Sequence, residues 1–120
     1  MTINEMGKDE RIKKILASWR GPQRLKEDTW QNVQLVLDYY GFFYEKKSDW
    51  VCSHDEFIKL TENPHSKEFF QLVGLGADGD FSIAVTHGAR RKSGMVIRCY
   101  LNDILKFIDL LETIRGRKKS

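Results

Sequence analysis

Cysteine is scarce in this chain, and the residue spacings that commonly bind zinc are missing. Only two cysteines occur among 120 residues, Cys52 and Cys99, and they are far apart in the sequence. There is no Cys-x-x-Cys or His-Glu-x-x-His spacing, and the three histidines, His54, His65 and His87, are too scattered to indicate a zinc site. We therefore expect no metal, no cofactor and no disulfide framework, with both cysteines reduced and at least partly buried.

Long apolar runs are also missing. Residues 1–10 lack the apolar core of a signal peptide, and no later run approaches the length needed to span a bilayer. The length suits one domain, and a composition of 41% hydrophobic and 31% charged residues is ordinary for a globular protein. These features predict a cytoplasmic protein that does not enter a membrane.

A large net charge is absent from the whole chain but not from its segments. The formal net charge is only +3, so total charge does not predict nucleic-acid binding. Residues 1–26 contain seven Lys or Arg and three Asp or Glu, whereas residues 27–87 contain four and eleven. Residues 88–98 contain four basic residues and no acidic one. Such clustering can form a basic face on a nearly neutral protein, although the basic residues after 114 are interpreted as a frayed tail.

Three segments carry apolar residues at helical spacing. The first is predicted over residues 8–19. The second is predicted over residues 29–40, where Asp28 or Thr29 can cap the exposed amides and Gly41 is a natural C-terminal stop. The third is predicted to begin near residue 95 and to line one side of the protein as far as residue 111. The aromatic residues of these stripes are interpreted as core.

Between the last two helices the pattern predicts strands. Residues 42–46 are aromatic, residues 50–60 alternate between two faces, and residues 80–86 alternate apolar and polar side chains. On this interpretation His54 lies on the second strand, with its direction undecided because neither face is cleanly apolar. Residues 63–72 are predicted to form a short helical insert, with Asn63 as its cap.

The order of these elements predicts the fold class. Strands grouped together between helices, without β-α-β alternation, indicate an α+β protein: a three-stranded antiparallel sheet with helices packed on one face. The other face of the sheet is expected to stay open to a ligand or partner. The Gly-rich run 74–79 lacks the Lys-Ser/Thr of a phosphate loop and is interpreted as a connection.

Several short motifs follow one another in a recognisable order. A helix ending in Tyr40-Gly41-Phe42 is followed by Cys52-Ser53-His54-Asp55-Glu56-Phe57, by Ile83-Ala84-Val85-Thr86-His87-Gly88 and by Arg90-Arg91-Lys92. This succession resembles the HicA family, the toxin components of bacterial HicA–HicB toxin–antitoxin pairs, over roughly residues 29–112. Two features depart from the family: Cys52 replaces its usual glycine, and the insert at 61–79 is longer than its simplest form.

The resemblance implies a fold like that of double-stranded-RNA-binding domains (dsRBD-like), α-β-β-β-α, with an extra N-terminal helix. The chain then divides into an N-terminal helical extension at 1–28, a HicA-like domain at 29–115 that contains the insert at 61–79, and a basic tail at 116–120. The implied activity is that of an mRNA interferase, an RNA-cleaving toxin of a type II toxin–antitoxin pair. The implied partners are RNA, expected to be mRNA, and a HicB-like antitoxin protein.

The resemblance also implies roles for individual residues. His54 would be the catalytic residue of a metal-independent endoribonuclease, because imidazole can accept or donate a proton near neutral pH while the 2′-hydroxyl of RNA attacks the neighbouring phosphate. Other residues are predicted to contact RNA, chiefly through its phosphates: Ser53, Arg90, Arg91, Lys92 and Arg98.

Two other interpretations stay open. The same dsRBD-like fold could serve as a non-catalytic RNA-binding or protein-interaction module, which Cys52 favours because its side chain could crowd an approach that glycine permits. A structural adaptor in which His54 simply packs is the third possibility. A hydrogen-bonding role is favoured for His87, and His65 is expected to be exposed and incidental.

Overall fold

In the computed structural model, which describes residues 3–22, 25–86 and 94–119, the chain begins with helix α1 (Ile3–Arg20). Ile12, Ile15 and Trp19 follow one another at helical spacing and are all buried. The Trp19 indole N–H donates a hydrogen bond of 2.8 Å to the carboxylate of Asp28, which is itself 7% exposed. Helix α1 therefore contributes to the main hydrophobic core, although the sequence suggested an added extension.

Helix α2 (Trp30–Tyr40) confirms the predicted second helix at both ends. The Thr29 hydroxyl accepts a hydrogen bond from the Asn32 amide at 3.2 Å, which caps the first turn. Gly41 ends the helix in the left-handed conformation, with φ +82°, which glycine adopts without steric cost. Local capping chemistry is sufficient to set these boundaries.

The predicted three-stranded antiparallel sheet is present. Its strands are β2 (Phe43–Lys46), β3 (Trp50–Ser53) and β4 (Phe81–Ile83), paired in the order β2-β3-β4. Tyr44 and Phe81 lie opposite Cys52 on the face that packs into the protein. On the other face, Phe43, Glu45 and Ser82 are exposed. The alternation of side chains along each strand produces this division.

The strand predicted over residues 50–60 is wrong in its second half. Strand β3 ends at Ser53, and helix α3 (Asp55–Leu60) follows at once. His54 is therefore a helix cap and does not lie on a strand surface. Two carboxylates, Asp55 and Glu56, occupy the first turn of α3, where the positive end of the helix dipole favours negative charge.

The predicted insert helix is present but begins later than expected. Helix α4 (Ser66–Val73) has His65 at its N-cap position, and no side chain caps it. The proposed cap, Asn63, instead accepts a hydrogen bond of 2.9 Å from the His65 amide through its side-chain oxygen. Gly74, with φ +89°, ends the helix.

A second, two-stranded sheet was not anticipated. Strand β1 (Glu27–Thr29) pairs antiparallel with β5 (Met95–Ile97), and helix α5 (Arg98–Lys119) follows directly. The last helix thus starts after Ile97, because the residues before it are held in the ladder with β1. The chain is an α+β protein in which the described residues form five helices and two small antiparallel sheets.

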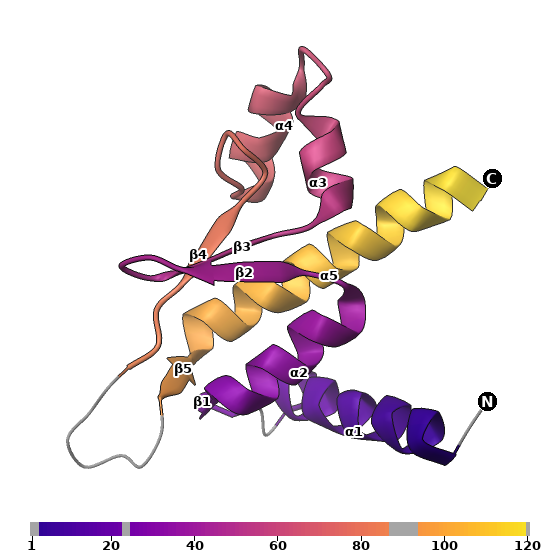
Figure 1. Cartoon of the computed structure of the whole chain (residues 1–120), viewed down its shortest axis with the longest axis vertical. Helices are drawn as coiled ribbons and strands as arrows, with labels where there is room; N and C mark the ends of the chain where they lie inside the picture. Colours follow the sequence, from indigo (N-terminus) through magenta and orange to yellow (C-terminus); the bar gives the residue numbers. More distant parts are fainter. Residues whose placement is uncertain (1–2, 23–24, 87–93, 120) are drawn as a thin grey trace.

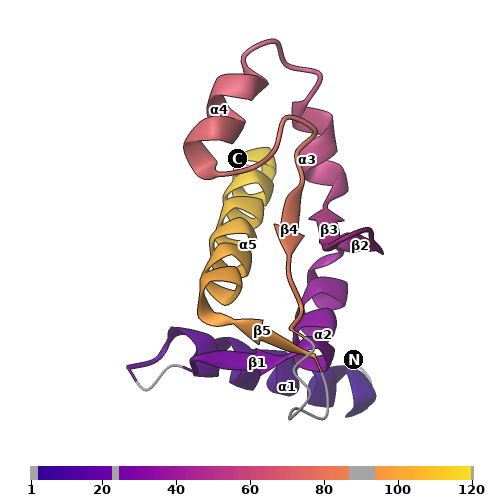
Figure 2. The same ribbon diagram turned by 90° about the vertical axis from the view of Figure 1, so that its left-hand side faces the viewer.

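Helix α5 is the central element of the packing. It runs diagonally behind the three-stranded sheet, while α1 and α2 lie to one side of it and α3 and α4 form an arm at the opposite end (Figure 1). Figure 2 shows the β1–β5 ladder beside α1, far from this arm. Phe81 and Phe107 join the sheet to α5 with ring centroids 4.5 Å apart.

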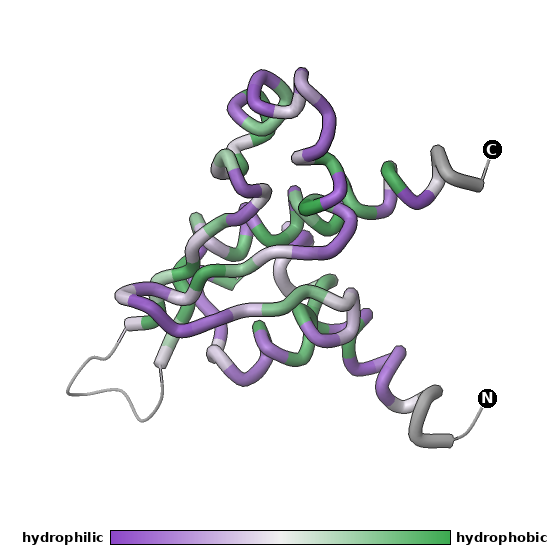
Figure 3. Tube along the Cα trace, turned by 45° about the horizontal axis from the view of Figure 1, so that its top comes forward, coloured by the Kyte–Doolittle hydropathy of each residue, from purple (hydrophilic) through white to green (hydrophobic). Residues whose placement is uncertain are grey.

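Hydropathy follows this arrangement. Hydrophobic segments gather where the strands cross α5, and the turn between β2 and β3 is hydrophilic (Figure 3). Within the described part of the chain, no helix combines the length and apolar character needed to cross a membrane.

Candidate functional site

His54 lies where three helices meet, and the side chain is 6% exposed. It occupies the N-cap position of α3 with an extended backbone, φ −146° and ψ 145°. The Glu56 amide donates a hydrogen bond of 3.0 Å to His54 Nδ1. This contact satisfies one of the amides that a helix start leaves without an acceptor, a task more often performed by Ser, Thr, Asp or Asn.

The other ring nitrogen of His54 contacts the C-terminal end of α2. Its Nε2 is 3.0 Å from the carbonyl oxygen of Tyr40. A carbonyl can only accept, so Nε2 must carry the proton, and an amide can only donate, so Nδ1 must be bare. The two neighbours therefore select the neutral Nε2–H tautomer, and His54 joins the end of α2 to the start of α3.

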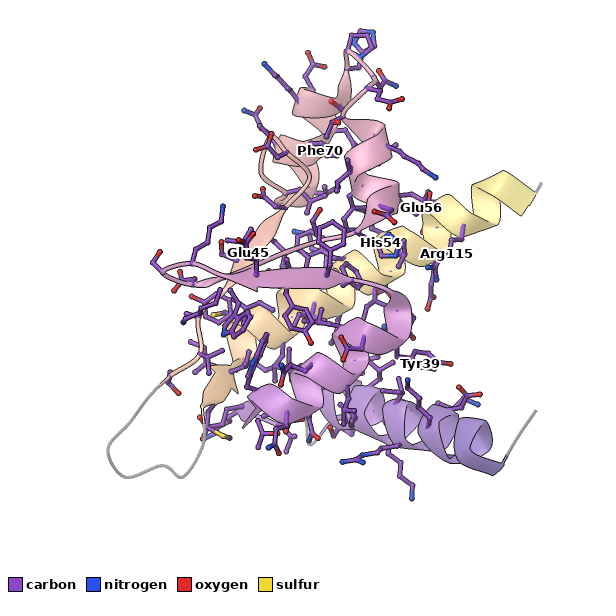
Figure 4. All side chains as sticks on the ribbon, in the orientation of Figure 1. Tyr39, Glu45, His54, Glu56, Phe70 and Arg115 are labelled. Atoms are coloured by element: carbon purple, nitrogen blue, oxygen red, sulfur yellow. The ribbon has the colours of Figure 1, made fainter. Side chains whose placement is uncertain are left out.

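Arg115 is the third member of this junction and comes from α5. Its Nη2 is 3.4 Å from the Tyr40 carbonyl oxygen and 3.4 Å from His54 Nε2. Both nitrogens carry protons in the selected tautomer, so they converge on the same carbonyl and do not bond to each other. Figure 4 shows Arg115 of α5 beside His54. The sequence pattern predicted a frayed tail here, and no local signal marks this arginine as a partner of His54.

The imidazole is also enclosed by aromatic rings and by a glycine. The Phe42 ring meets it edge-on at a centroid distance of 5.2 Å, and the Phe57 centroid is 6.0 Å away. A Cβ added at Gly41 would lie 3.3 Å from His54 Nε2. Gly41 thus has two reasons to be glycine: its positive φ and the close approach of the ring.

Burial lowers the pKa of His54 from its ordinary value of 6.5. Loss of solvation is the largest cause, because the charged imidazolium is poorly accommodated in an apolar enclosure. The bond to the Tyr40 carbonyl opposes this shift, Arg115 adds to it by charge repulsion, and Glu56 and Asp55 oppose it weakly. Protonation would also place a hydrogen on Nδ1, facing the Glu56 amide.

This lowered pKa predicts that the protein loses stability in mild acid. His54 binds its proton more readily in the unfolded chain, so its stabilising contribution is present above about pH 6.5 and is lost as pH falls through the lower folded-state pKa. We expect the free energy of unfolding, measured with denaturant between pH 7.5 and 5, to fall over this range. In the His54→Asn variant the free energy of unfolding should fall less steeply with falling pH. Parallel curves for the variant and the wild type would show that His54 does not cause the loss.

Two other predicted site residues are engaged in structural contacts. Ser53 is 7% exposed, and its hydroxyl donates a hydrogen bond of 2.8 Å to the Gly79 carbonyl. Arg98 donates to the carbonyl oxygens of Leu25, at 3.0 Å, and of Trp19, which ties α5 to the end of α1. These contacts indicate structural roles and leave Ser53 little access to RNA.

The remaining predictions fall on different parts of the chain. Arg90, Arg91 and Lys92, together with His87, lie outside the described residues. Their described neighbours Thr86 and Met95 pair with each other.

The two cysteines differ in their surroundings. Cys52 is fully buried on the inner face of the sheet, where desolvation raises its pKa to about 12 and keeps the thiol protonated. Its side chain points into the core, so it does not crowd the outer face. Cys99, predicted to be at least partly buried, is exposed. His65 is exposed, as expected.

The arrangement around His54 suits holding three helices together better than proton transfer. A general base needs a free lone pair within reach of the hydroxyl that it deprotonates. Here the lone pair on Nδ1 already accepts from Glu56, and Nε2 carries a proton that Tyr40 accepts. Among the described residues, no three His, Cys, Asp or Glu side chains gather as a metal-binding group.

Comparisons with protein-family models, with curated proteins and with solved structures find no match to this chain. The HicA resemblance therefore depends on the motifs and their order alone.

Proposed function

We propose that this protein is a non-catalytic RNA-binding module whose fold His54 helps to hold. The observation that carries the proposal is the engagement of both ring nitrogens of His54, by the Glu56 amide and the Tyr40 carbonyl. With α3, α4 and β5 set aside, the succession α2, β2, β3, β4, α5 supports it further, because it has the helix, three-strand, helix order of the dsRBD-like fold. Helices α3 and α4 are then an insertion between the second and third strands of that fold.

Exposed basic side chains support RNA as the partner. Helix α1 presents several of them, whereas one of its acidic residues, Asp9, accepts a hydrogen bond of 2.7 Å from the Tyr39 hydroxyl. Two more, Lys46 and Lys47, are exposed at the turn between β2 and β3. Lysine and arginine on such surfaces contact phosphates in a salt-dependent manner. The exposed basic residues of α1 whose side chains are described are Lys8, Arg11, Lys13, Lys14 and Arg20, the last of which is paired with Asp109 at 2.9 Å.

Binding to a short single-stranded RNA should weaken as salt rises, and the slope should depend on particular cations. Replacing Arg90, Arg91 and Lys92 together with alanine is expected to weaken binding and to reduce the slope of log K against log salt by about 2, because roughly 0.7 counterions are released per phosphate contact. Fluorescence anisotropy over a salt series measures this. The matched control is Lys59→Ala with Lys67→Ala on the α3–α4 arm, which should change little. If the wild type, the triple variant and the control all gave the same slope, residues 90–92 would be excluded as the RNA contact.

A ribonuclease toxin with a HicB-like antitoxin partner is the second candidate. It is favoured by Arg115, which brings a cation to 3.4 Å from the His54 ring, as stabilisation of a crowded phosphate would require. For cleavage, the ring would have to release the Tyr40 carbonyl so that Nε2 could exchange protons with RNA.

One incubation separates the two candidates. Purified protein is mixed with RNA in the presence of a chelator, and both binding and chain length are followed. The proposal predicts bound but intact RNA. Cleavage by the wild type that disappears in His54→Asn would instead establish the nuclease, since asparagine can still cap α3. RNA that is neither bound nor cut would reject both.

A further inference from the structure

A pocket of about 280 Å³ lies between the α3–α4 arm and the C-terminal half of α5. Its apolar lining comes from one residue of each helix: Leu60 of α3, Phe69 of α4 and Ile114 of α5. Asn63, His65 and Ser66 supply the polar part of the lining. A mostly apolar hollow with a few polar groups is the usual form of a small-molecule site, and this volume is near the lower end of the range.

Ser66 is the unusual member of this lining. It is 8% exposed, and among the described residues its hydroxyl has no hydrogen-bond partner, whereas its backbone amide donates to the Asn63 carbonyl at 3.0 Å. The hydroxyl oxygen is not fully buried, so it still meets water in the pocket, and a bound molecule can replace that water. A hydroxyl in the wall of a pocket can be paired by a molecule that enters the pocket.

The same end of the pocket has the uncapped start of α4. No side chain caps this helix, and of its first amides those of Ser66 and Phe69 find backbone acceptors. The amides of Lys67 and Glu68 have no acceptor within the described chain. Free amides and the positive end of the helix dipole favour an anion here. The exposed side chains of Lys67 and Glu68 are opposite in charge, so they largely offset each other.

We propose that this pocket binds a small carboxylic acid with an apolar body. The body would lie against Leu60, Phe69 and Ile114. The carboxylate would accept hydrogen bonds from the Ser66 hydroxyl and from the amides that begin α4, with His65 at the same polar end. The site is separate from the RNA-binding proposal, since none of its lining residues takes part in that proposal.

The test is a titration of the full chain with sodium octanoate, followed by amide chemical shifts. The expected result is saturable shifts confined to residues near Leu60, Ser66 and Ile114. Octanol, which has the same body without the charge, should bind at least about tenfold more weakly, because hydrogen bonds to a charged group contribute more than neutral ones.

Three variants make the result specific. Ser66→Ala should weaken octanoate binding by about tenfold without lowering the thermal midpoint, because the hydroxyl has no partner in the described protein. Ile114→Trp should fill the half-buried pocket wall and abolish binding. Leu72→Trp is the matched control, because Leu72 is on the same helix as Ser66, is 83% exposed and does not line the pocket. This variant should bind octanoate as the wild type does.

Several outcomes would overturn the proposal. Absence of saturable shifts with octanoate, shifts centred elsewhere on the protein, or equal binding of octanol would each do so. Unchanged binding in Ser66→Ala would also contradict it, and this variant remains informative even if Ile114→Trp fails to fold.

Discussion

Replacing His54 with alanine is expected to lower the free energy of unfolding by about 2–4 kcal/mol. The change removes the cap of α3, the bond to the Glu56 amide, which contributes roughly 1 kcal/mol, and it leaves the Tyr40 carbonyl without its ring partner, at about 1–3 kcal/mol for a buried group. It also empties the space beside Phe42 and Phe57. Denaturant unfolding followed by circular dichroism measures the difference.

His54→Asn is the matched variant, because it separates the two bonds of the ring. Asparagine is a good N-cap residue, so its side-chain oxygen can still accept from the Glu56 amide. Its side chain is too short to reach the Tyr40 carbonyl as well. We therefore expect His54→Asn to lower the free energy of unfolding by roughly half as much as His54→Ala does. If alanine at this position left stability unchanged, His54 would have no structural role, and the catalytic interpretation would regain its place.

Replacing Trp19 with alanine should have a still larger effect, about 3–5 kcal/mol, as for other large aromatic residues removed from a core. Trp19 is fully buried, and its indole N–H is one of the donors to the buried Asp28 carboxylate. The Thr29 amide at 2.7 Å and the Asn32 side-chain amide at 2.9 Å also donate to it. Thermal and denaturant unfolding would both report the loss.

Trp19→Phe distinguishes packing from hydrogen bonding at this position. Phenylalanine keeps much of the ring volume but has no N–H for Asp28, so an intermediate loss of about 1–3 kcal/mol is expected. If the Trp19→Ala variant unfolded like the wild type, α1 would be a dispensable addition to the fold. The contacts of α1 with Asp28 and Arg98 lead us to expect the opposite.

The parts of the fold that were predicted from sequence are those set by local chemistry. Helix α2 was predicted within one residue because Thr29 and Gly41 define its ends regardless of the rest of the chain. The three-stranded antiparallel sheet was predicted because aromatic and alternating residues indicate strands. The α+β class followed from that order.

The errors concern interactions between distant residues. The alternation from Trp50 to Ile58 suits a strand, but the chain turns into α3 after Ser53, where the His54 ring is held by the Tyr40 carbonyl and the Glu56 amide, with Arg115 beside it. Arg115 is 61 positions from His54 in the sequence, so no spacing rule could have paired them. Strands β1 and β5 have three residues each, too few for periodicity to be recognised.

The protonation state of the His54 ring is the most direct test of its structural role. Nitrogen-15 NMR of histidine side chains identifies which ring nitrogen carries the proton, and a pH series gives the pKa. We predict a proton on Nε2, a bare Nδ1 and a midpoint below the ordinary 6.5. A proton on Nδ1 with a free Nε2, titrating at or above 6.5, would contradict the account and point to a ring prepared for proton transfer.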